Sequence, residues 1–172
     1  MWFTGLSGSG KTTIARLVAR ELQERRLKVE RLDGDVVRQS LTRDLGFSKE
    51  DRDKNIERVT FVAKLLTRNG VGVLCAFISP YREQRAKSRQ EIGEFIEVYV
   101  ECPLDVCVQR DVKGLYVKAI NGEIENFTGV SDPYEPPDDP EIICRTAQET
   151  PQQSAGTIIA YLEARGYIPI RA

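Results

Sequence analysis

Five short apolar runs recur along the chain, and segments with helical periodicity separate most of them. The runs are Trp2–Thr4, Val29–Leu32, Val71–Phe77, Phe95–Val100 and Ile142–Cys144. Continuous apolar strands that alternate with helices are typical of a parallel sheet covered on both faces. The pattern therefore predicts an α/β fold of three layers, with a five-stranded parallel sheet flanked by helices. At 172 residues, one domain spanning 1–172 is the expected organisation.

Two segments carry clear signals for helix starts. Ser48 is a suitable N-cap for a helix that extends to about Asn69, before Gly70. Its apolar residues recur at spacings of three and four, at Ile56, Val59, Ala63 and Leu66. Thr150 followed by Pro151 predicts the start of another helix, with proline at the first helical position. The apolar face of this second helix comprises Ala155, Ile158, Ile159 and Leu162.

A glycine-rich run directly after the first apolar segment matches the pattern G-x-x-x-x-G-K-[ST], which binds the phosphates of ATP or GTP. It reads Gly5, Leu6, Ser7, Gly8, Ser9, Gly10, Lys11 and Thr12. A helix predicted from Thr13 to about Arg26 directs the positive end of its dipole at the same anion, and Thr13 belongs to the predicted nucleotide site. We expect Lys11 to reach the β- and γ-phosphates and the Thr12 hydroxyl to bind Mg²⁺. A glycine-rich turn without a ligand is the alternative, and the flanking strand and helix disfavour it.

The segment from about Lys113 to Pro140, called the lid segment below, breaks the alternation of strands and helices. It is rich in glycine and proline and has few consecutive apolar residues. Long loops inside compact domains are usually functional or disordered. In a phosphate-binding enzyme such a loop is expected to close and to exclude water from the γ-phosphate. The sequence therefore predicts a mobile lid, with a passive loop as the alternative.

Composition limits the classes of partner. The chain has 25 basic and 26 acidic residues, a net charge of −1, and so has no overall basic field to attract nucleic acid or an anionic membrane. It contains no histidine, so proton transfer falls to a carboxylate or another group. No apolar run approaches the roughly 18 residues of a membrane span, and we expect no signal peptide before the phosphate loop. We expect a cytoplasmic protein.

The cysteines lie far apart in the sequence, at Cys75, Cys102, Cys107 and Cys144. No C-x-x-C pair occurs, and no histidine is present to complete a zinc site. The spacing favours buried thiols in a reducing compartment, with a regulatory disulfide as the alternative.

Two aspartates follow the second apolar run. Asp33 and Asp35 lie at the carboxyl end of a predicted parallel strand, where ligands bind in open α/β sheets. The third run has no acidic residue at its end, so this pair is expected to organise Mg²⁺, with Thr12 and Asp33 as metal ligands. One of the two aspartates is expected to accept the proton of an attacking hydroxyl. An Asx turn that caps a helix is the alternative role.

Positive and aromatic side chains follow the aspartates. Arg38 shares a helix face with Asp35, and Arg52 shares one with Asn55. Arginines that converge near this site predict an acceptor with its own negative charge, whereas a single arginine is more often a solvated surface charge. The aromatic residues Phe47 and Phe127 suit either a core position or the stacking of a base.

Six motifs together resemble the adenylylsulfate kinase family over nearly the whole chain. They are Gly5–Thr12, Leu32–Asp35, Arg43–Ser48, Ala76–Arg82, Arg110–Tyr116 and Asn126–Gly129. The resemblance implies a P-loop kinase fold and ATP-dependent phosphorylation of the 3′-hydroxyl of adenosine 5′-phosphosulfate, the second step of sulfate activation. It also implies a homodimer and a functional link to ATP sulfurylase. A P-loop kinase of another small acceptor and a non-catalytic nucleotide-binding regulatory module are the alternatives.

The resemblance also implies roles for individual residues. Lys11, Asp33, Asp35 and Ser79 correspond to catalytic positions, and Arg110 to a partner of the ATP adenine. The positions that correspond to substrate contacts are Asp35, Arg38, Phe47, Arg52, Asn55, Ile78, Ser79, Lys113, Asn126 and Phe127. The serine that corresponds to Ser79 has been assigned in the family as a phosphorylated intermediate, but no obvious base stands beside it in this sequence. A hydrogen bond from Ser79 to the nucleotide is our expectation.

Two positions depart from the family pattern. Many relatives have asparagine after the second aspartate, where this chain has Val36. One polar contact near the site is then missing, and we expect catalysis to survive its loss. Relatives also usually have residues before the first strand, whereas Met1 directly precedes that strand here.

Overall fold

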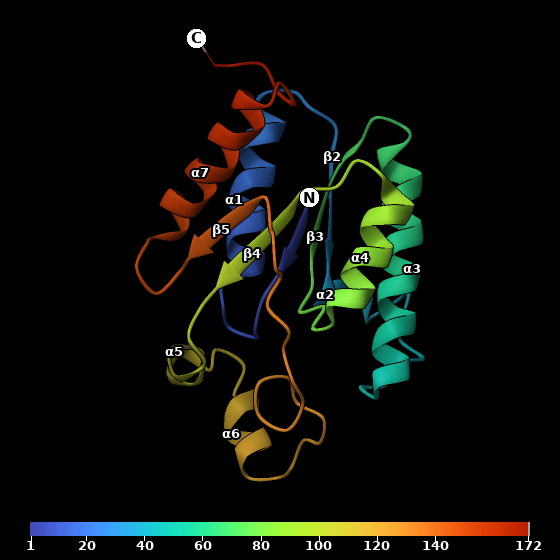
Figure 1. Ribbon diagram of the computed structural model, residues 1–172, viewed down its shortest axis with the longest axis vertical. Coiled ribbons are helices and arrows are strands. Elements are labelled where there is room, and N and C mark those ends of the chain that lie inside the picture. Colours follow the sequence, from blue (N-terminus) through green and yellow to red (C-terminus); the bar gives the residue numbers. More distant parts are fainter. Residues whose placement is uncertain (172) are drawn as a thin grey trace.

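The computed structural model describes residues 1–171 of the chain. The elements alternate between strands and helices over most of the sequence (Figure 1). They are β1 (Trp2–Thr4), α1 (Lys11–Glu24), β2 (Val29–Asp33), α2 (Gly34–Val37), α3 (Lys49–Thr67), β3 (Gly72–Ala76), α4 (Arg82–Ile92), β4 (Glu97–Glu101), α5 (Leu104–Arg110), α6 (Leu115–Ile120), β5 (Ile142–Arg145) and α7 (Pro151–Ala164).

The strands form one parallel sheet in the order β2-β3-β1-β4-β5. The central strand β1 pairs with β3 on one side, through Phe3 and Ala76, and with β4 on the other, through Phe3 and Val98. The strand arrows end at the edge of the sheet where α2, α5 and α6 lie (Figure 1). The predicted five-stranded parallel sheet flanked by helices is therefore confirmed, and its carboxyl edge is the place for a ligand.

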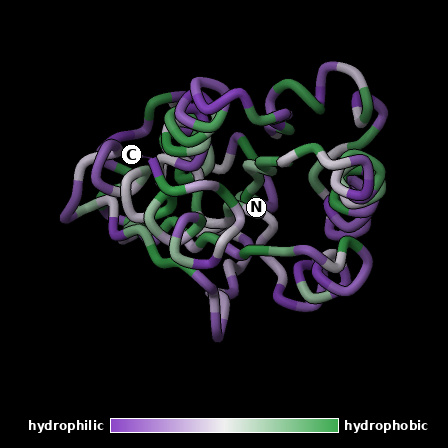
Figure 2. The backbone as a smooth tube through the Cα atoms, turned by 90° about the horizontal axis from the view of Figure 1, so that it is seen from above, coloured by the Kyte–Doolittle hydropathy of each residue, from purple (hydrophilic) through white to green (hydrophobic). Residues whose placement is uncertain are grey.

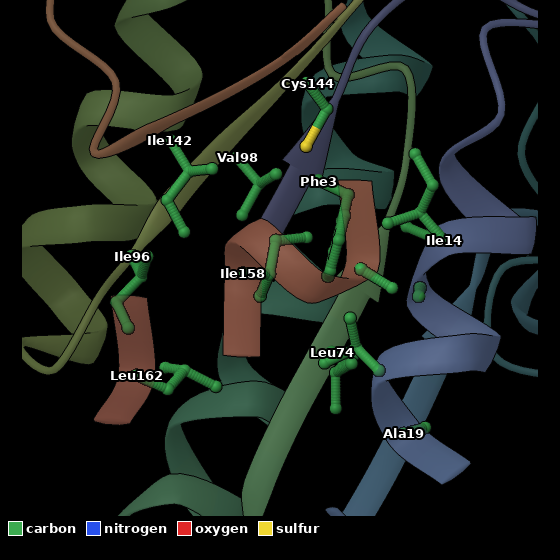
Figure 3. Packing of buried hydrophobic residues seen from close by; sticks show 14 of the residues in the cluster. Phe3, Ile14, Ala19, Leu74, Ile96, Val98, Ile142, Cys144, Ile158 and Leu162 are labelled. Atoms are coloured by element: carbon green, nitrogen blue, oxygen red, sulfur yellow. The ribbon is translucent and has the colours of Figure 1, made fainter. Parts of the chain in front are cut away.

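Helices α1 and α7 cover one face of the sheet. Phe3 and Val98 from the strands pack there against Ile14 of α1 and Ile158 of α7, and all four side chains are inaccessible to solvent. Figure 3 shows these side chains directed toward one another. Each such apolar side chain stabilises the folded state by about 1.5–3 kcal/mol through its burial. The core beneath α1 thus fixes the helix that follows the phosphate loop.

Helices α3 and α4 lie on the opposite face (Figure 1). Trp2 neighbours Phe3 in β1 and points to this second face, since side chains alternate along a strand. Its ring stacks on Phe77 at 5.9 Å and on Phe95 at 5.7 Å between centroids. Along the helices the tube in Figure 2 changes between hydrophobic and hydrophilic segments, as expected for helices with one face on a sheet.

Both predicted N-caps are confirmed. The Ser48 hydroxyl accepts a hydrogen bond from the Asp51 N–H at 3.2 Å. Thr150 forms a capping box with Gln153, in which each side chain accepts a hydrogen bond from the other residue's backbone N–H. Gly70, with φ at +75°, lies just beyond the end of α3 as predicted.

Several boundaries differ from the sequence prediction. Helix α1 begins at Lys11 rather than Thr13, because the left-handed Gly10 ends the phosphate loop directly before it. The third and fourth strands are shorter or shifted, at Gly72–Ala76 and Glu97–Glu101. Residues at the ends of these two apolar runs are buried without being part of the sheet, so hydropathy alone overestimated the lengths of the two strands.

The lid segment is not one long loop, which corrects the prediction. It contains α6 (Leu115–Ile120), in whose first turn the N–H groups of Tyr116 and Val117 donate to the carboxylate of Asp111. Six residues are too few to show helical periodicity, so this capping contact decides the structure. Helix α4 also lacks an apolar stripe, since its buried residues are Arg85 and Ser88. Within residues 1–171, no helix combines the length and the apolar character that crossing a membrane requires.

Candidate active site

The phosphate loop connects β1 to α1 at the carboxyl edge of the sheet. Gly5 has φ at +151°, and a Cβ atom there would lie 2.5 Å from the carbonyl oxygen of Val100 in β4. Gly10 has φ at +106° and is the N-cap of α1. Because only glycine adopts these conformations without strain, the loop can turn its N–H groups toward an anion at the start of α1.

Lys11 is buried in the loop. Its Nζ donates hydrogen bonds to the carbonyl oxygens of Gly5 at 3.0 Å and of Leu6 at 2.6 Å. The pKa of Lys11 is lowered to about 8, mainly by burial and in smaller part by the positive charge of Lys113. A phosphate group near Nζ would favour the charged form, so this side chain is arranged to gain stabilisation from an anionic ligand.

Thr12 and Asp33 meet at the start of α1. The Thr12 hydroxyl donates to Oδ2 of Asp33 at 2.7 Å, while Oδ1 of Asp33 accepts from the N–H of Asp35 at 3.1 Å. Asp33 is therefore the N-cap of α2, the alternative role considered above, and it also keeps one carboxylate oxygen next to Thr12.

A hydroxyl beside a carboxylate is a donor set that fits Mg²⁺, a cation that prefers oxygen ligands. Among residues 1–171, no group of three or more acidic, cysteine or histidine side chains gathers to hold a metal ion. Mg²⁺ at this site would therefore be bound by Thr12, Asp33, nucleotide phosphates and water, which is its usual coordination in phosphoryl-transfer enzymes.

Asp35 lies in the first turn of α2 with its side chain largely exposed. Its Oδ2 accepts a hydrogen bond from Nζ of Lys113 in the lid segment. The structure thus brings together a predicted catalytic carboxylate and a predicted substrate-binding lysine from positions far apart in the sequence.

Arg38 and Phe47 form a second side of the site. The Arg38 guanidinium donates to the carbonyl oxygens of Leu45 and Gly46, and its central carbon lies 4.3 Å from the centroid of the Phe47 ring. Burial lowers the pKa of Arg38, and the nearby charge of Arg52 lowers it further. Two guanidinium groups close enough to repel each other predict an anionic ligand between or beside them.

Arg52 joins helix α3 to the lid segment. Its Nε donates to the carbonyl oxygen of Phe47 at 2.9 Å. Its other nitrogens donate to the Thr128 hydroxyl and the Asn126 carbonyl oxygen, and one of them lies 3.2 Å from Oδ2 of Asp132. The backbone of Asn126 thus lies beside Arg52, and its contact with the substrate stays a prediction.

Asn55 lies one turn beyond Arg52 on α3 and is 6% exposed. Among the described residues, its Oδ1 is one of two buried side-chain oxygens or nitrogens without a hydrogen-bond partner. An unpaired buried polar group costs about 1–3 kcal/mol, so a polar ligand that donates to Oδ1 would remove that cost.

Phe127 packs inside the lid segment. Its ring makes an edge-on contact with Tyr116 of α6, at 5.1 Å between centroids. The Tyr116 hydroxyl donates to the carbonyl oxygen of Ser7 at 2.9 Å, so the lid segment contacts the phosphate loop directly. Phe47, unlike Phe127, is largely accessible to solvent, with 59% of its surface exposed.

Ser79 is buried and its hydroxyl points into the core. The hydroxyl accepts a hydrogen bond from the Trp2 indole N–H at 3.0 Å. The carbonyl oxygens of Ile78 and Ser79 accept hydrogen bonds from the Thr4 hydroxyl at 2.8 and 3.4 Å. The structure therefore does not bring the Ser79 hydroxyl to the aspartate pair, and its hydrogen bond to a nucleotide remains a prediction.

Thr146 is a residue that the sequence analysis missed. Its hydroxyl donates to the carbonyl oxygen of Ser9 in the phosphate loop at 2.8 Å. Arg110, predicted as an adenine partner, donates to the Thr146 carbonyl oxygen at 2.6 Å. The available signal was its position directly after the fifth strand, at the same sheet edge as Asp33.

Comparison with known proteins decides the family. A family model described as adenylylsulphate kinase matches residues 1–145. The chain belongs to the adenylylsulphate kinase family. The adenylyl-sulfate kinase of Halothermothrix orenii is 65% identical over 168 residues, which cover 98% of this chain and 91% of that protein. The probable bifunctional SAT/APS kinase 2 of Sorangium cellulosum is 52% identical over 99% of this chain and 29% of its own length.

A solved structure of the adenylylsulphate kinase family agrees. The Mycobacterium tuberculosis APS kinase CysC, in complex with AMPPNP and APS, superposes with a TM-score of 0.90 and 44% identity, covering 94% of this chain and 95% of that one. The resemblance read from the six motifs is thereby confirmed, and so is the P-loop kinase fold.

Proposed function

We propose that this protein transfers the γ-phosphoryl group of ATP to the ribose 3′-hydroxyl of adenosine 5′-phosphosulfate, giving 3′-phosphoadenylyl sulfate and ADP. The observation that carries the proposal is the Thr12–Asp33 hydrogen bond, which joins the phosphate loop to the aspartate pair. The contact between Arg38 and Phe47, a few residues further along the chain, supports it. The first contact suits a metal-bound triphosphate, and the second suits an acceptor with both an anionic group and an aromatic base.

Each site residue has its own role in the proposed phosphoryl transfer. The loop N–H groups and Lys11 bind the β- and γ-phosphates, and charge on the transferred group is stabilised there. The 3′-oxygen forms a bond to the γ-phosphorus, the bond from that phosphorus to the β–γ bridging oxygen breaks, and Asp35 accepts the hydroxyl proton. Mg²⁺, held by Thr12 and Asp33, would neutralise phosphate charge. Arg38 and Arg52 bind the phosphosulfate group, so the acceptor is positioned before transfer.

The chemistry of the substrate indicates which reaction must supply it. Adenosine 5′-phosphosulfate must be supplied by a reaction that joins sulfate to the adenylyl group of ATP, which supports the link to ATP sulfurylase. The S. cellulosum relative, whose name joins SAT and APS kinase, favours the same link. A homodimer and a cytoplasmic location complete the proposal, and the four buried free thiols suit a reducing compartment.

The test is to incubate the protein with Mg-ATP and adenosine 5′-phosphosulfate, with AMP and gluconate as parallel acceptors, and to identify products by mass spectrometry. Phosphate added only to the phosphosulfate nucleotide is expected, and the Lys11→Ala variant should give none. Transfer to another acceptor alone would replace the proposed substrate, and ATP binding without any transfer would favour a regulatory module.

A further inference from the structure

Arg85 of α4 is a buried cation that is not among the site residues described above. Its side chain is 3% exposed, and Nε donates to Oε1 of Glu97 at 2.7 Å. The two terminal nitrogens donate to backbone carbonyl oxygens, one of Ser79 at 2.6 Å and one of Glu135 at 2.7 Å. The two backbone contacts pair the terminal N–H groups of the buried guanidinium, and they also tie it to two separate segments of the chain.

The first backbone contact holds a strained turn. Ser79 has φ at +40°, a left-handed conformation that residues other than glycine rarely adopt without support from their surroundings. The support comes from Arg85 and from Thr4, whose hydroxyl donates to the carbonyl oxygens of Ile78 and Ser79. Thr4 is the last residue of β1 and directly precedes the phosphate loop. Arg85 and β1 therefore support the same turn.

The second backbone contact holds residues 132–136 of the lid segment, called the return segment here. The Glu135 N–H donates to the carbonyl oxygen of Pro80 at 2.9 Å, and the Tyr134 hydroxyl lies 2.9 Å from the Thr4 hydroxyl. At the other end of the return segment, Oδ2 of Asp132 accepts a hydrogen bond from Tyr81 at 3.0 Å and lies next to Arg52. The return segment therefore connects Arg85 with an arginine of the acceptor side.

We propose that Arg85 is a positioning residue that fixes the Ser79 turn and the return segment relative to each other, and thereby sets the geometry of the acceptor side of the site. This inference rests on the proposed function, since it assigns the Arg52 side to the acceptor. Arg85 touches neither substrate. It acts through the backbone of Ser79 and Glu135, whereas Glu97 holds the guanidinium in place.

The test separates positioning from simple stability. Arg85→Gln removes the bonds to Ser79 and Glu135 but leaves Glu97 with less compensation, so the double variant Arg85→Gln/Glu97→Gln is measured beside it. Glu97→Gln alone keeps the backbone bonds of Arg85. Arg89→Gln is the matched control, because Arg89 lies on the same helix and pairs with Glu97 and Glu141, but donates to neither Ser79 nor Glu135.

We expect the double variant to raise the KM for adenosine 5′-phosphosulfate by about tenfold while the KM for ATP changes by less than about twofold. Hydrogen exchange of the Glu135 amide should become faster in the same variant. Glu97→Gln and Arg89→Gln should keep the wild-type ratio of the two KM values, whatever they do to Tm.

Equal rises in both KM values, or an unchanged acceptor KM in a folded double variant, would show that Arg85 is merely structural. Failure of the proposed function looks different: the wild-type protein would then transfer no phosphate to adenosine 5′-phosphosulfate at all. In that case the exchange rate of the Glu135 amide still reports whether Arg85 holds the return segment, and an unchanged rate would overturn the inference.

Discussion

Lys113 of the lid segment donates a hydrogen bond to the carboxylate of Asp35 in α2, 78 positions earlier in the chain. The contact joins the lid segment to the residue that we propose as the proton acceptor. Because the same lysine also lowers the pKa of Lys11, its charge acts on both the phosphate loop and the aspartate pair. The position of the lid segment and the charge of Lys11 are therefore coupled.

The first prediction concerns Asp35. Asp35→Asn keeps the shape of the side chain but removes its capacity to accept a proton, so kcat should fall by about a hundredfold or more with little change in the KM for ATP. Asp53→Asn is the matched control, since Asp53 lies on α3 and pairs with Lys49 at 3.1 Å. Steady-state kinetics measure both parameters, and near-normal turnover by the Asp35→Asn variant would exclude Asp35 as the base.

The second prediction concerns pH. The pKa of Lys11 is lowered to about 8 by burial, so the free protein loses this positive charge as pH rises through that value. Binding of a non-hydrolysable ATP analogue should therefore weaken above about pH 8, because the neutral amine attracts phosphate less. Isothermal titration calorimetry on both sides of pH 8 measures the effect. The Lys11→Ala variant should bind weakly without this pH step, and a flat wild-type profile would contradict the role of the buried lysine.

The third prediction uses two phenylalanines of equal exposure. Phe47 and Phe61 are both 59% exposed, but only Phe47 has a guanidinium, that of Arg38, over its ring. Base stacking on an aromatic ring is worth about 1–3 kcal/mol, so Phe47→Ala should raise the acceptor KM by about tenfold or more. Phe61→Ala should leave it unchanged. The same response from both variants would argue that Phe47 is an ordinary surface residue.

The fourth prediction concerns Thr146. Thr146→Val keeps the branched shape and removes the hydrogen bond to the Ser9 carbonyl oxygen, which holds the phosphate loop. ATP affinity should fall by about threefold to tenfold, the value of one ordinary hydrogen bond. Thr157→Val is the control, because Thr157 donates to the carbonyl oxygen of Gln153 within α7. A calorimetric Kd for ATP that is the same in both variants would show that the Thr146 contact does not support the loop.

The fifth prediction contrasts two glycines. Nothing lies within 4 Å of a Cβ atom placed on Gly156 in α7, so Gly156→Ala should increase the free energy of unfolding by about 0.5–1 kcal/mol. Gly5→Ala should decrease it, since the new methyl group would lie 2.5 Å from the Val100 carbonyl oxygen. Thermal denaturation measures both. A Gly5→Ala protein as stable as the wild type would mean that β4 and the phosphate loop can separate at no cost.

Much of the fold could be predicted because its signals are local. The order of strands in the chain, the caps at Ser48 and Thr150 and the phosphate loop each depend on residues within a few positions of one another. Helices α4 and α6 could not be found in this way. Arg85 is buried in α4 because Glu97 lies across from it, and α6 depends on a cap from Asp111.

The same distinction between local signals and long-range contacts applies to the site residues. Their chemical types, and the motifs that resemble the adenylylsulfate kinase family, are contained in the sequence by itself. The tertiary structure decided what each one contacts: the Ser79 hydroxyl meets Trp2, Arg52 meets the lid segment, and Thr146 meets the phosphate loop. These contacts join distant positions, and periodicity and spacing report only on neighbours along the chain. Packing of the sheet against its helices brings such positions together, so only the folded chain shows them.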